Sequence, residues 1–196
     1  MENLQKYESA LQYINRALEL EPDYADAYLM KGVILGKLGL CSDALKCFDK
    51  AIELNPDSPY VWHIKGATLA SLDRHVEALN CYNQAIELDP TNIEAQLDKG
   101  FSLQSLNNLQ EALKCYEEAL KQKPSEARIW HSKGVVYGKL GDYEKALSHF
   151  NRALELKLDF AEALIGKSMV LAKAGKNDEA NECIRKAERL ENQKRW

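Results

Sequence analysis

Apolar residues of this chain recur in two helical stripes within each stretch of 34 residues. In residues 127–160 the two stripes are Trp130, Gly134 and Tyr137, then Ala146, Phe150 and Ala153. Steps of three and four residues place side chains on one face of an α-helix. Each stretch is therefore predicted to form two amphipathic helices, and the chain is predicted to be all-α.

The pattern returns at a fixed interval of 34 residues, which is typical of proteins built from stacked repeats. The interval is kept by the prolines Pro22, Pro56, Pro90 and Pro124 and by the glycines Gly32, Gly66, Gly100 and Gly134. We number positions within a repeat from 1 to 34. Five full repeats are predicted, at 25–58, 59–92, 93–126, 127–160 and 161–194. Residues 1–24 form a half repeat with only the second helix, and residues 195–196 form a C-terminal tail.

The residues between the helices predict where each helix ends. Position 15 holds Gly39, Asp73, Asn107, Gly141 and Gly175, residue types that tolerate the left-handed backbone at a helix end. The proline at position 32 ends the second helix. The glycine at position 8 predicts a close approach of the two helices, with the alanine of position 20 opposite it and the aromatic residue of position 24 filling the remaining space.

These columns resemble the tetratricopeptide repeat, most clearly in Trp130-x-x-Lys133-Gly134-x-x-Tyr137 followed by Ala146-x-x-x-Phe150. The resemblance covers essentially the whole chain. It implies an all-α, right-handed superhelical solenoid of antiparallel helix pairs, with the first helix of each pair lining a concave groove. It also implies a protein–protein interaction scaffold that binds a peptide or helix of a partner protein in that groove.

The groove positions of the family are matched here by an apolar floor with a mixed polar rim, as a peptide or helix would require. The candidate partner-binding residues are Leu29, Val33, Tyr60, His63, Ala67, Leu97, Phe101, Gln104, Arg128, His131, Val135, Ile165 and Met169. Family members that grip acidic chaperone tails carry lysine and asparagine where this chain has Leu29 and Val33. That class of partner is therefore not expected. The alternative function is self-association through the terminal helices.

The charge of the chain favours a protein as the binding partner. The formal net charge is -4, whereas nucleic acid and anionic membrane surfaces attract clustered basic residues. The N-terminus lacks the apolar core of a signal peptide, and charges interrupt every long segment. We expect a cytoplasmic protein that binds neither nucleic acid nor membrane.

Reactive side chains are present but do not form a plausible catalytic or metal site. Position 23 holds Cys47, Cys81, Cys115 and Cys183, with His149 in the remaining repeat. Packed helices lie about 8–10 Å apart, too far for these residues to share one zinc ion. The cysteines are interpreted as small packing residues. His63 and His131 at position 5 either hydrogen-bond a bound peptide or are solvated. We expect no cofactor, no metal, no catalytic residue and no enzyme activity.

Three departures from the family pattern lead to further expectations. The lysines at position 7, from Lys31 to Lys167, have two interpretations: an anion-binding stripe, or apolar stems that cover the neighbouring repeat while the amines reach water. The acidic net charge of the chain favours the second interpretation. Leu158 replaces the expected proline, so either a smoother turn or one long helix joins the last repeats. The final helix is a partial cap, since Ile184, Leu190 and Trp196 still need cover.

The N-terminal half repeat leaves part of its stripe uncovered. This stripe is formed by Leu4, Tyr7, Leu11 and Ile14. Another chain, a longer parent protein, or a cap formed in place are the alternatives for covering it.

Overall fold

The computed structural model describes residues 2–193, and the predicted tail 195–196 and Trp196 lie outside them. Eleven α-helices and no strand occur in this range. The chain divides into two compact units, which meet in sequence between Leu106 and Asn107, inside the 93–126 repeat. Among residues 2–193, no helix combines the length and the apolar character that crossing a membrane requires.

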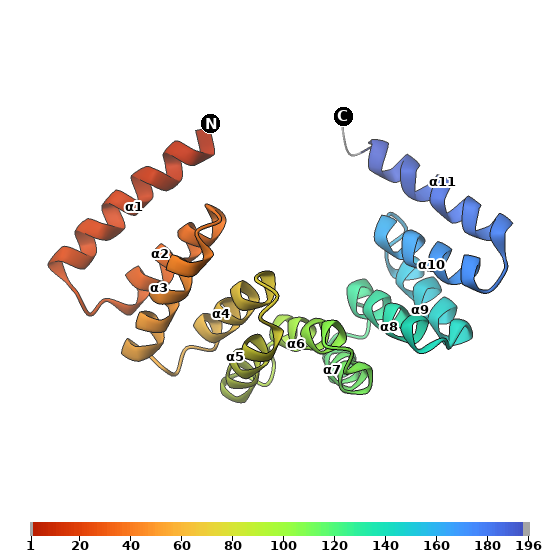
Figure 1. Ribbon diagram of the computed structural model, residues 1–196, viewed down its shortest axis with the longest axis horizontal. Coiled ribbons are helices and arrows are strands. Elements are labelled where there is room, and N and C mark those ends of the chain that lie inside the picture. The colour runs from red at the N-terminus through yellow and green to blue at the C-terminus, as the bar shows by residue number, and fades with distance from the viewer. Residues whose placement is uncertain (1, 194–196) are drawn as a thin grey trace. The chain divides into compact units, whose positions relative to one another are not determined.

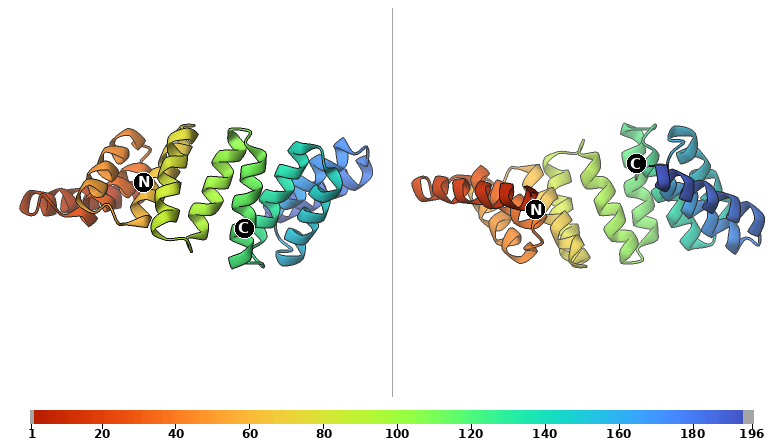
Figure 2. Two further views of the ribbon diagram at one scale, coloured as in Figure 1. Left: turned by 90° about the horizontal axis from the view of Figure 1, so that it is seen from below. Right: turned by 90° about the horizontal axis from the view of Figure 1, so that it is seen from above.

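The first unit contains α1 to α6 (Figure 1). The helices are α1 (Glu2–Leu20), α2 (Ala25–Lys37), α3 (Cys41–Leu54), α4 (Pro59–Ser71), α5 (His75–Leu88) and α6 (Ile93–Ser105). Each helix packs against the next one along the chain, as the two further views in Figure 2 also show. The first helices of successive repeats also touch, α2 against α4 and α4 against α6.

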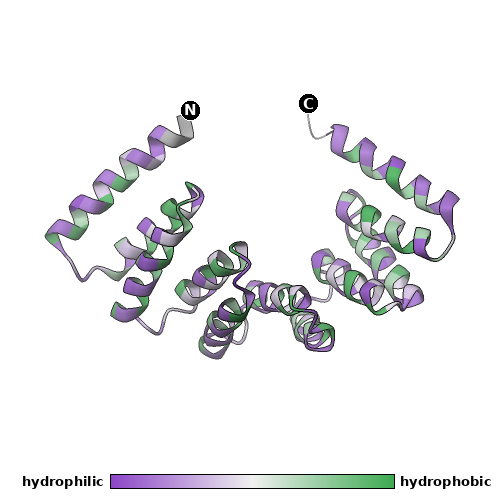
Figure 3. Ribbon diagram, in the orientation of Figure 1, coloured by the Kyte–Doolittle hydropathy of each residue, from purple (hydrophilic) through white to green (hydrophobic). Residues whose placement is uncertain are grey.

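The second unit contains α7 to α11 and repeats this arrangement. Its helices are α7 (Leu109–Gln122), α8 (Ala127–Leu140), α9 (Tyr143–Leu156), α10 (Ala161–Lys173) and α11 (Asn177–Gln193). Leu158 lies in the turn between α9 and α10, so no continuous helix joins the last two repeats. Hydrophobic residues gather on the sides of α8, α9 and α10 that face one another (Figure 3).

The turns between the paired helices use the left-handed backbone at position 15 in all five repeats. The φ angles are 57° at Asp73 and 62° at Asn107, and they are 77°, 80° and 79° at Gly39, Gly141 and Gly175. The next backbone N–H then bonds a carbonyl five residues back, for example Arg74 to Leu69 at 3.0 Å. This is the Schellman motif that ends helices. The sequence prediction for these turns is confirmed.

The glycine at position 8 faces a different neighbour from the one predicted. A Cβ added at Gly32 would lie 2.5 Å from the ring of Phe48, and one at Gly66 would lie 2.7 Å from the ring of Tyr82. The aromatic residue of position 24, and not the alanine of position 20, is therefore opposite the glycine. Aromatic rings are flat, so one can lie directly against the exposed backbone of a glycine.

Tryptophan or glutamine at position 4 of the three middle repeats donates a hydrogen bond to the end of the preceding repeat. Trp62 Nε1 donates to the Pro56 carbonyl and Trp130 Nε1 to the Pro124 carbonyl, each at 2.8 Å. Gln96 Nε2 makes the equivalent bond to Pro90 at 3.0 Å. These bonds satisfy a carbonyl just beyond the end of the preceding second helix, which the helix itself leaves without a donor. In the last repeat Leu164 replaces the donor, and Leu158 stands in the place of the proline.

The terminal helices are covered to different degrees. On α1, Ile14 is buried, while Tyr7 and Leu11 are half-buried. The predicted stripe therefore has partial cover within the chain, and the side chain of Leu4 lies outside the described part. On α11, Ile184 is 42% exposed, whereas Leu190 packs against the buried cluster of Ala161, Leu164 and Ala187.

Candidate protein-binding face

In each unit the first helices of the repeats carry exposed apolar side chains, and we call the exposed side of these helices the helix-A face of that unit. In the first unit it is formed by α2, α4 and α6, and in the second by α8 and α10. Phe101 on α6 is 55% exposed and Met169 on α10 is 60% exposed. Tyr60 and Ile165 are also exposed. Exposed apolar groups on the first helices of a unit favour binding to another protein.

The first unit has an apolar pocket on this face, between α2 and α4. Its volume is about 290 Å³. The aliphatic and aromatic side chains around it include Val33, Phe48, Ile64 and Ala67. Lys37 is the one charged residue that lines it.

The second unit has a smaller pocket, between α8 and α10. Its volume is about 140 Å³, close to that of an apolar cavity that holds one benzene ring. The lining residues are Val135, Gly138, Lys139, Phe150, Gly166, Met169, Val170 and Lys173.

The two pockets occupy equivalent positions three repeats apart. Val33 corresponds to Val135, Gly36 to Gly138, and Phe48 to Phe150 in the 34-residue register. Their rims differ, since Ser71 in the first pocket corresponds to Lys173 in the second. Equivalent positions of the repeat therefore line a pocket in both units, and the second pocket carries one more lysine than the first.

Glycine forms part of the second pocket because the Phe150 ring lies against it. A Cβ added at Gly166 would lie 2.7 Å from Phe150, and one at Gly134 would lie 2.9 Å from the same ring. Phe150 is 1% exposed. Its ring is held between the first helices of two successive repeats, and this makes it the floor of the pocket.

The two histidines of position 5 are half-buried and have partners within the chain, and their predicted contact with a peptide stays a prediction. His63 Nε2 lies 2.7 Å from Asp98 Oδ2, and the His63 side chain is 12% exposed. His131 packs between the rings of Phe150 and Phe160, with centroid distances of 5.7 and 5.2 Å. Burial lowers the pKa of His131, and the nearby Glu162 partly offsets this effect. Both histidines thus contribute to packing.

The other predicted groove residues range from buried to exposed. Leu97 is buried, so it belongs to the core and does not line the surface. Leu29, Val33, Ala67, Gln104 and Val135 are half-buried. Arg128 is exposed and donates from Nε to Glu126 Oε1 at 3.4 Å.

Two of the lysines of position 7 pair with carboxylates of the preceding repeat, so their amines do not simply reach water. Lys65 Nζ lies 2.6 Å from Asp49, and Lys133 Nζ lies 3.2 Å from Glu117. Asp49 and Glu117 both occupy position 25 of the preceding repeat. The ammonium groups therefore reach the second helix of the previous repeat and pair there. Lys133 is buried.

Cysteine packing agrees with the sequence interpretation. Cys47, Cys81 and Cys183 are buried, and Cys41 and Cys115 are half-buried. Burial raises the pKa of the Cys47 and Cys81 thiols. A raised pKa keeps a thiol protonated and weakly nucleophilic at neutral pH.

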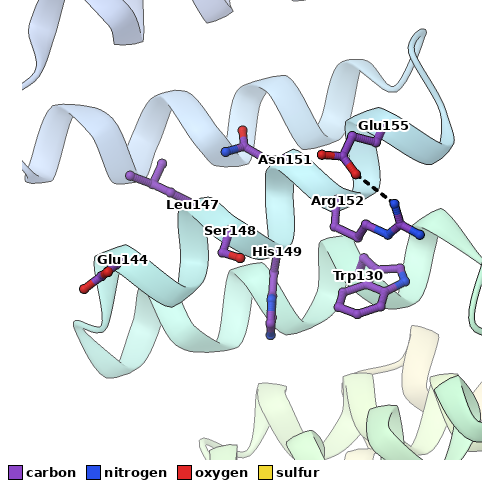
Figure 4. A pocket seen from close by; sticks show the side chains of 8 residues that line it. All are labelled: Trp130, Glu144, Leu147, Ser148, His149, Asn151, Arg152 and Glu155. Carbon is purple, nitrogen blue, oxygen red and sulfur yellow. Dashed lines mark hydrogen bonds and ion pairs between the residues drawn. The ribbon is translucent and has the colours of Figure 1, made fainter.

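Sequence reasoning missed a hollow on the opposite side, along the second helices. In the second unit it has a volume of about 620 Å³ and is bordered by Trp130, Leu147, His149 and Arg152 among others (Figure 4). The His149 ring lies edge-on to Trp130 and Tyr137, with centroid distances of 5.5 and 5.0 Å. Burial lowers its pKa, and Lys133 acts in the same direction. The aromatic contacts at His149 secure α9 on α8, and the ion pair of Arg152 with Glu155 lies within one helix. The residues around this hollow thus serve mainly to pack α9 on α8.

Family models described as tetratricopeptide repeat match residues 4–67, 59–92, 91–159 and 131–193. No curated protein matches the sequence at a significant level.

Solved structures of similar fold include PilW, a type IV pilus biogenesis factor. Its TM-score is 0.82 at 22% identity, over 92% of this chain and 84% of that one. MamA from Desulfovibrio magneticus RS-1 has a TM-score of 0.77 at 20% identity, over 86% and 96% of the two chains. YrrB, described as having an unusual peptide-binding site, has a TM-score of 0.70 at 21% identity, over 90% and 91%. At these identities the likeness concerns the fold.

Proposed function

Since the chain belongs to the tetratricopeptide repeat family, we propose that it is a protein-interaction scaffold whose helix-A face binds a peptide or helix of a partner protein. The observation that carries the proposal is the pair of equivalent apolar pockets on this face, one in each unit. Apolar pockets with a few polar groups at the rim are the usual form of a peptide anchor site. The peptide-binding site that is named for YrrB, a protein of similar fold, supports the same reading.

The proposed partner is protein, and the scaffold needs no cofactor and performs no catalysis. Both pockets are lined mainly by aliphatic and aromatic side chains, and the formal net charge of the chain is -4. These features favour an apolar protein segment over nucleic acid or a membrane surface. We place the scaffold in the cytoplasm, because no disulfide joins cysteines within residues 2–193, as is usual in a reducing compartment.

Selection from a random peptide-display library, followed by affinity measurement on the variants Phe101→Glu and Met169→Gln, tests the proposal. Both residues are exposed on the helix-A face. Val76→Glu and Ile184→Gln are matched controls, because these exposed apolar residues belong to second helices. We expect peptides whose binding is lost in at least one helix-A variant and kept in both controls. Peptides that bind all four variants like the wild type would place binding elsewhere.

Self-association is the second candidate, and one exposed leucine beside an apolar pocket near the C-terminal end favours it. Leu158 is 84% exposed beside a pocket of about 360 Å³ that also includes Leu154, Leu164 and Leu190. A second copy could cover this patch. Analytical ultracentrifugation of the wild type and of Leu158→Lys over a range of concentrations tests this candidate. A mass that rises with concentration in the wild type alone would support it, and a constant monomer mass would refute it.

A further inference from the structure

The charge at the rims of the two helix-A pockets is of one sign, although the chain is acidic. Among the lining residues the charged ones are Lys37 in the first pocket and Lys139 and Lys173 in the second. Neither lining contains an aspartate or a glutamate. The formal net charge of the whole chain is -4. The charged residues that line the two pockets are thus all lysines, in contrast to the acidic balance of the whole chain.

These lysines lie in the last turns of α2, α8 and α10. A basic residue there also interacts favourably with the negative end of the helix dipole. The helices α4 and α6 have Ser71 and Ser105 at the same position and are equally long as α2. Helix termination thus does not require a lysine at this position, and it does not by itself account for two lysines at one pocket.

The shape of the second pocket sets the size of what it can hold. At about 140 Å³ it has room for one aliphatic or aromatic side chain, whereas the first pocket has about twice that volume. The Phe150 floor is fixed between Gly134 and Gly166, so the pocket cannot deepen without a backbone shift. Met169 at its edge is largely exposed and offers an adaptable apolar contact.

Resting on the function proposed above, we propose that the pocket between α8 and α10 binds one aliphatic or aromatic side chain of an acidic peptide segment. The carboxylates next to this anchor meet Lys139 and Lys173. Apolar burial supplies most of the affinity, and the lysines select for acidic neighbours and speed association. The first pocket, with Lys37 and Ser71, selects less strongly for charge.

The test uses peptides from the display selection, labelled with fluorescein, and measures their dissociation constants by fluorescence anisotropy. Each peptide is compared with a version in which glutamine replaces every glutamate and aspartate. The protein is the wild type, the double variant Lys139→Glu/Lys173→Glu, and the double variant Lys114→Glu/Lys123→Glu. Lys114 and Lys123 are exposed residues of the same unit that lie on or just after the second helix α7, so this control adds the same charge away from the pocket.

We expect the first double variant to bind the acidic peptide about tenfold more weakly than the wild type, and the control to stay within about twofold. The glutamine version should bind the wild type about tenfold more weakly and lose its salt dependence. Equal binding of the acidic and glutamine versions, or an unchanged affinity in Lys139→Glu/Lys173→Glu, would overturn the inference. Such peptides would still support the scaffold function if Met169→Gln abolished their binding. If the selection gave no peptide that depends on the helix-A face, the proposed function itself would fail.

Cys41 reports which pocket is occupied, because it lines the first pocket and has no counterpart in the second. Its alkylation by iodoacetamide can be followed by peptide mapping. We expect the acidic peptide to leave the rate of Cys41 alkylation unchanged. Protection of Cys41 together with unchanged binding in Lys139→Glu/Lys173→Glu would assign the peptide to the first pocket and overturn the inference.

Discussion

Two glycines of helix α2 should respond in opposite directions to the same substitution. A Cβ at Gly32 would lie 2.5 Å from the buried Phe48 ring, whereas a Cβ at Gly36 would meet nothing within 4 Å. Alanine in a helix is more stable than glycine by about 0.5–1 kcal/mol. Overpacking a tight core costs about 1–3 kcal/mol. Gly36→Ala should therefore stabilise the protein, by the lower end of the helix term because it lies in the last turn. Gly32→Ala should destabilise it by up to about 2 kcal/mol.

Thermal and urea unfolding followed by far-UV circular dichroism measure this difference. For a chain of this size, 1 kcal/mol shifts the midpoint by about 2–4 °C. We expect the midpoint of Gly32→Ala to lie below that of the wild type and that of Gly36→Ala to lie slightly above it. Phe48→Leu should relieve the clash, so the double variant Gly32→Ala/Phe48→Leu should be more stable than the sum of the single effects by about 0.5–3 kcal/mol. Equal midpoints for the two alanine variants would refute the packing of the ring on Gly32.

Three further changes test other features of the fold. Asp73→Gly should raise the free energy of unfolding by about 0.5–1 kcal/mol, because glycine adopts the φ of 57° without the Cβ strain of aspartate. A lower urea midpoint than that of the wild type would contradict this. Burial lowers the pKa of His131, so the unfolded chain binds the extra proton and stability should fall as the pH drops below about 6.5. His131→Phe should flatten this dependence in urea titrations at several pH values, and an unchanged slope would argue against the burial effect. Trp130→Phe removes the 2.8 Å hydrogen bond to the Pro124 carbonyl and should lower the free energy of unfolding by about 1 kcal/mol in the same assay. An unchanged free energy of unfolding would mean that water replaces the donor and that the bond adds no stability.

Local backbone features could be predicted from the sequence because each depends on a few neighbouring residues. The left-handed turn at position 15 follows from the preference of glycine, asparagine and aspartate for that conformation. The stripes of apolar residues likewise define which face of each helix is buried. These properties recur in all five repeats, so each repeat supports the same prediction of two helices joined by a left-handed turn.

Side-chain partners between repeats could not be predicted in the same way. His63 was assigned to the groove from its column, but its partner Asp98 belongs to the next repeat and to a different column. Lys133 was interpreted as reaching water, whereas Glu117 lies on the preceding second helix within 3.2 Å. Such pairs depend on which residues the stacking brings together, and the register of a single repeat does not contain that information. The hollow beside His149 was missed for the same reason.

The position of Phe150 links occupancy of the second pocket to the opening of the last repeat. Its ring touches Gly134 of its own repeat and Gly166 of the next, so the pocket floor exists while α10 is docked on α8 and α9. Fraying of α10 and α11 from the end of the unit would dissolve the pocket. A peptide bound in the pocket would oppose this fraying by mass action, because it binds only while α10 is docked. Amide hydrogen exchange in α10 and α11 would then slow as the pocket becomes saturated with peptide. Partner binding would thereby also stabilise the last repeat against local unfolding.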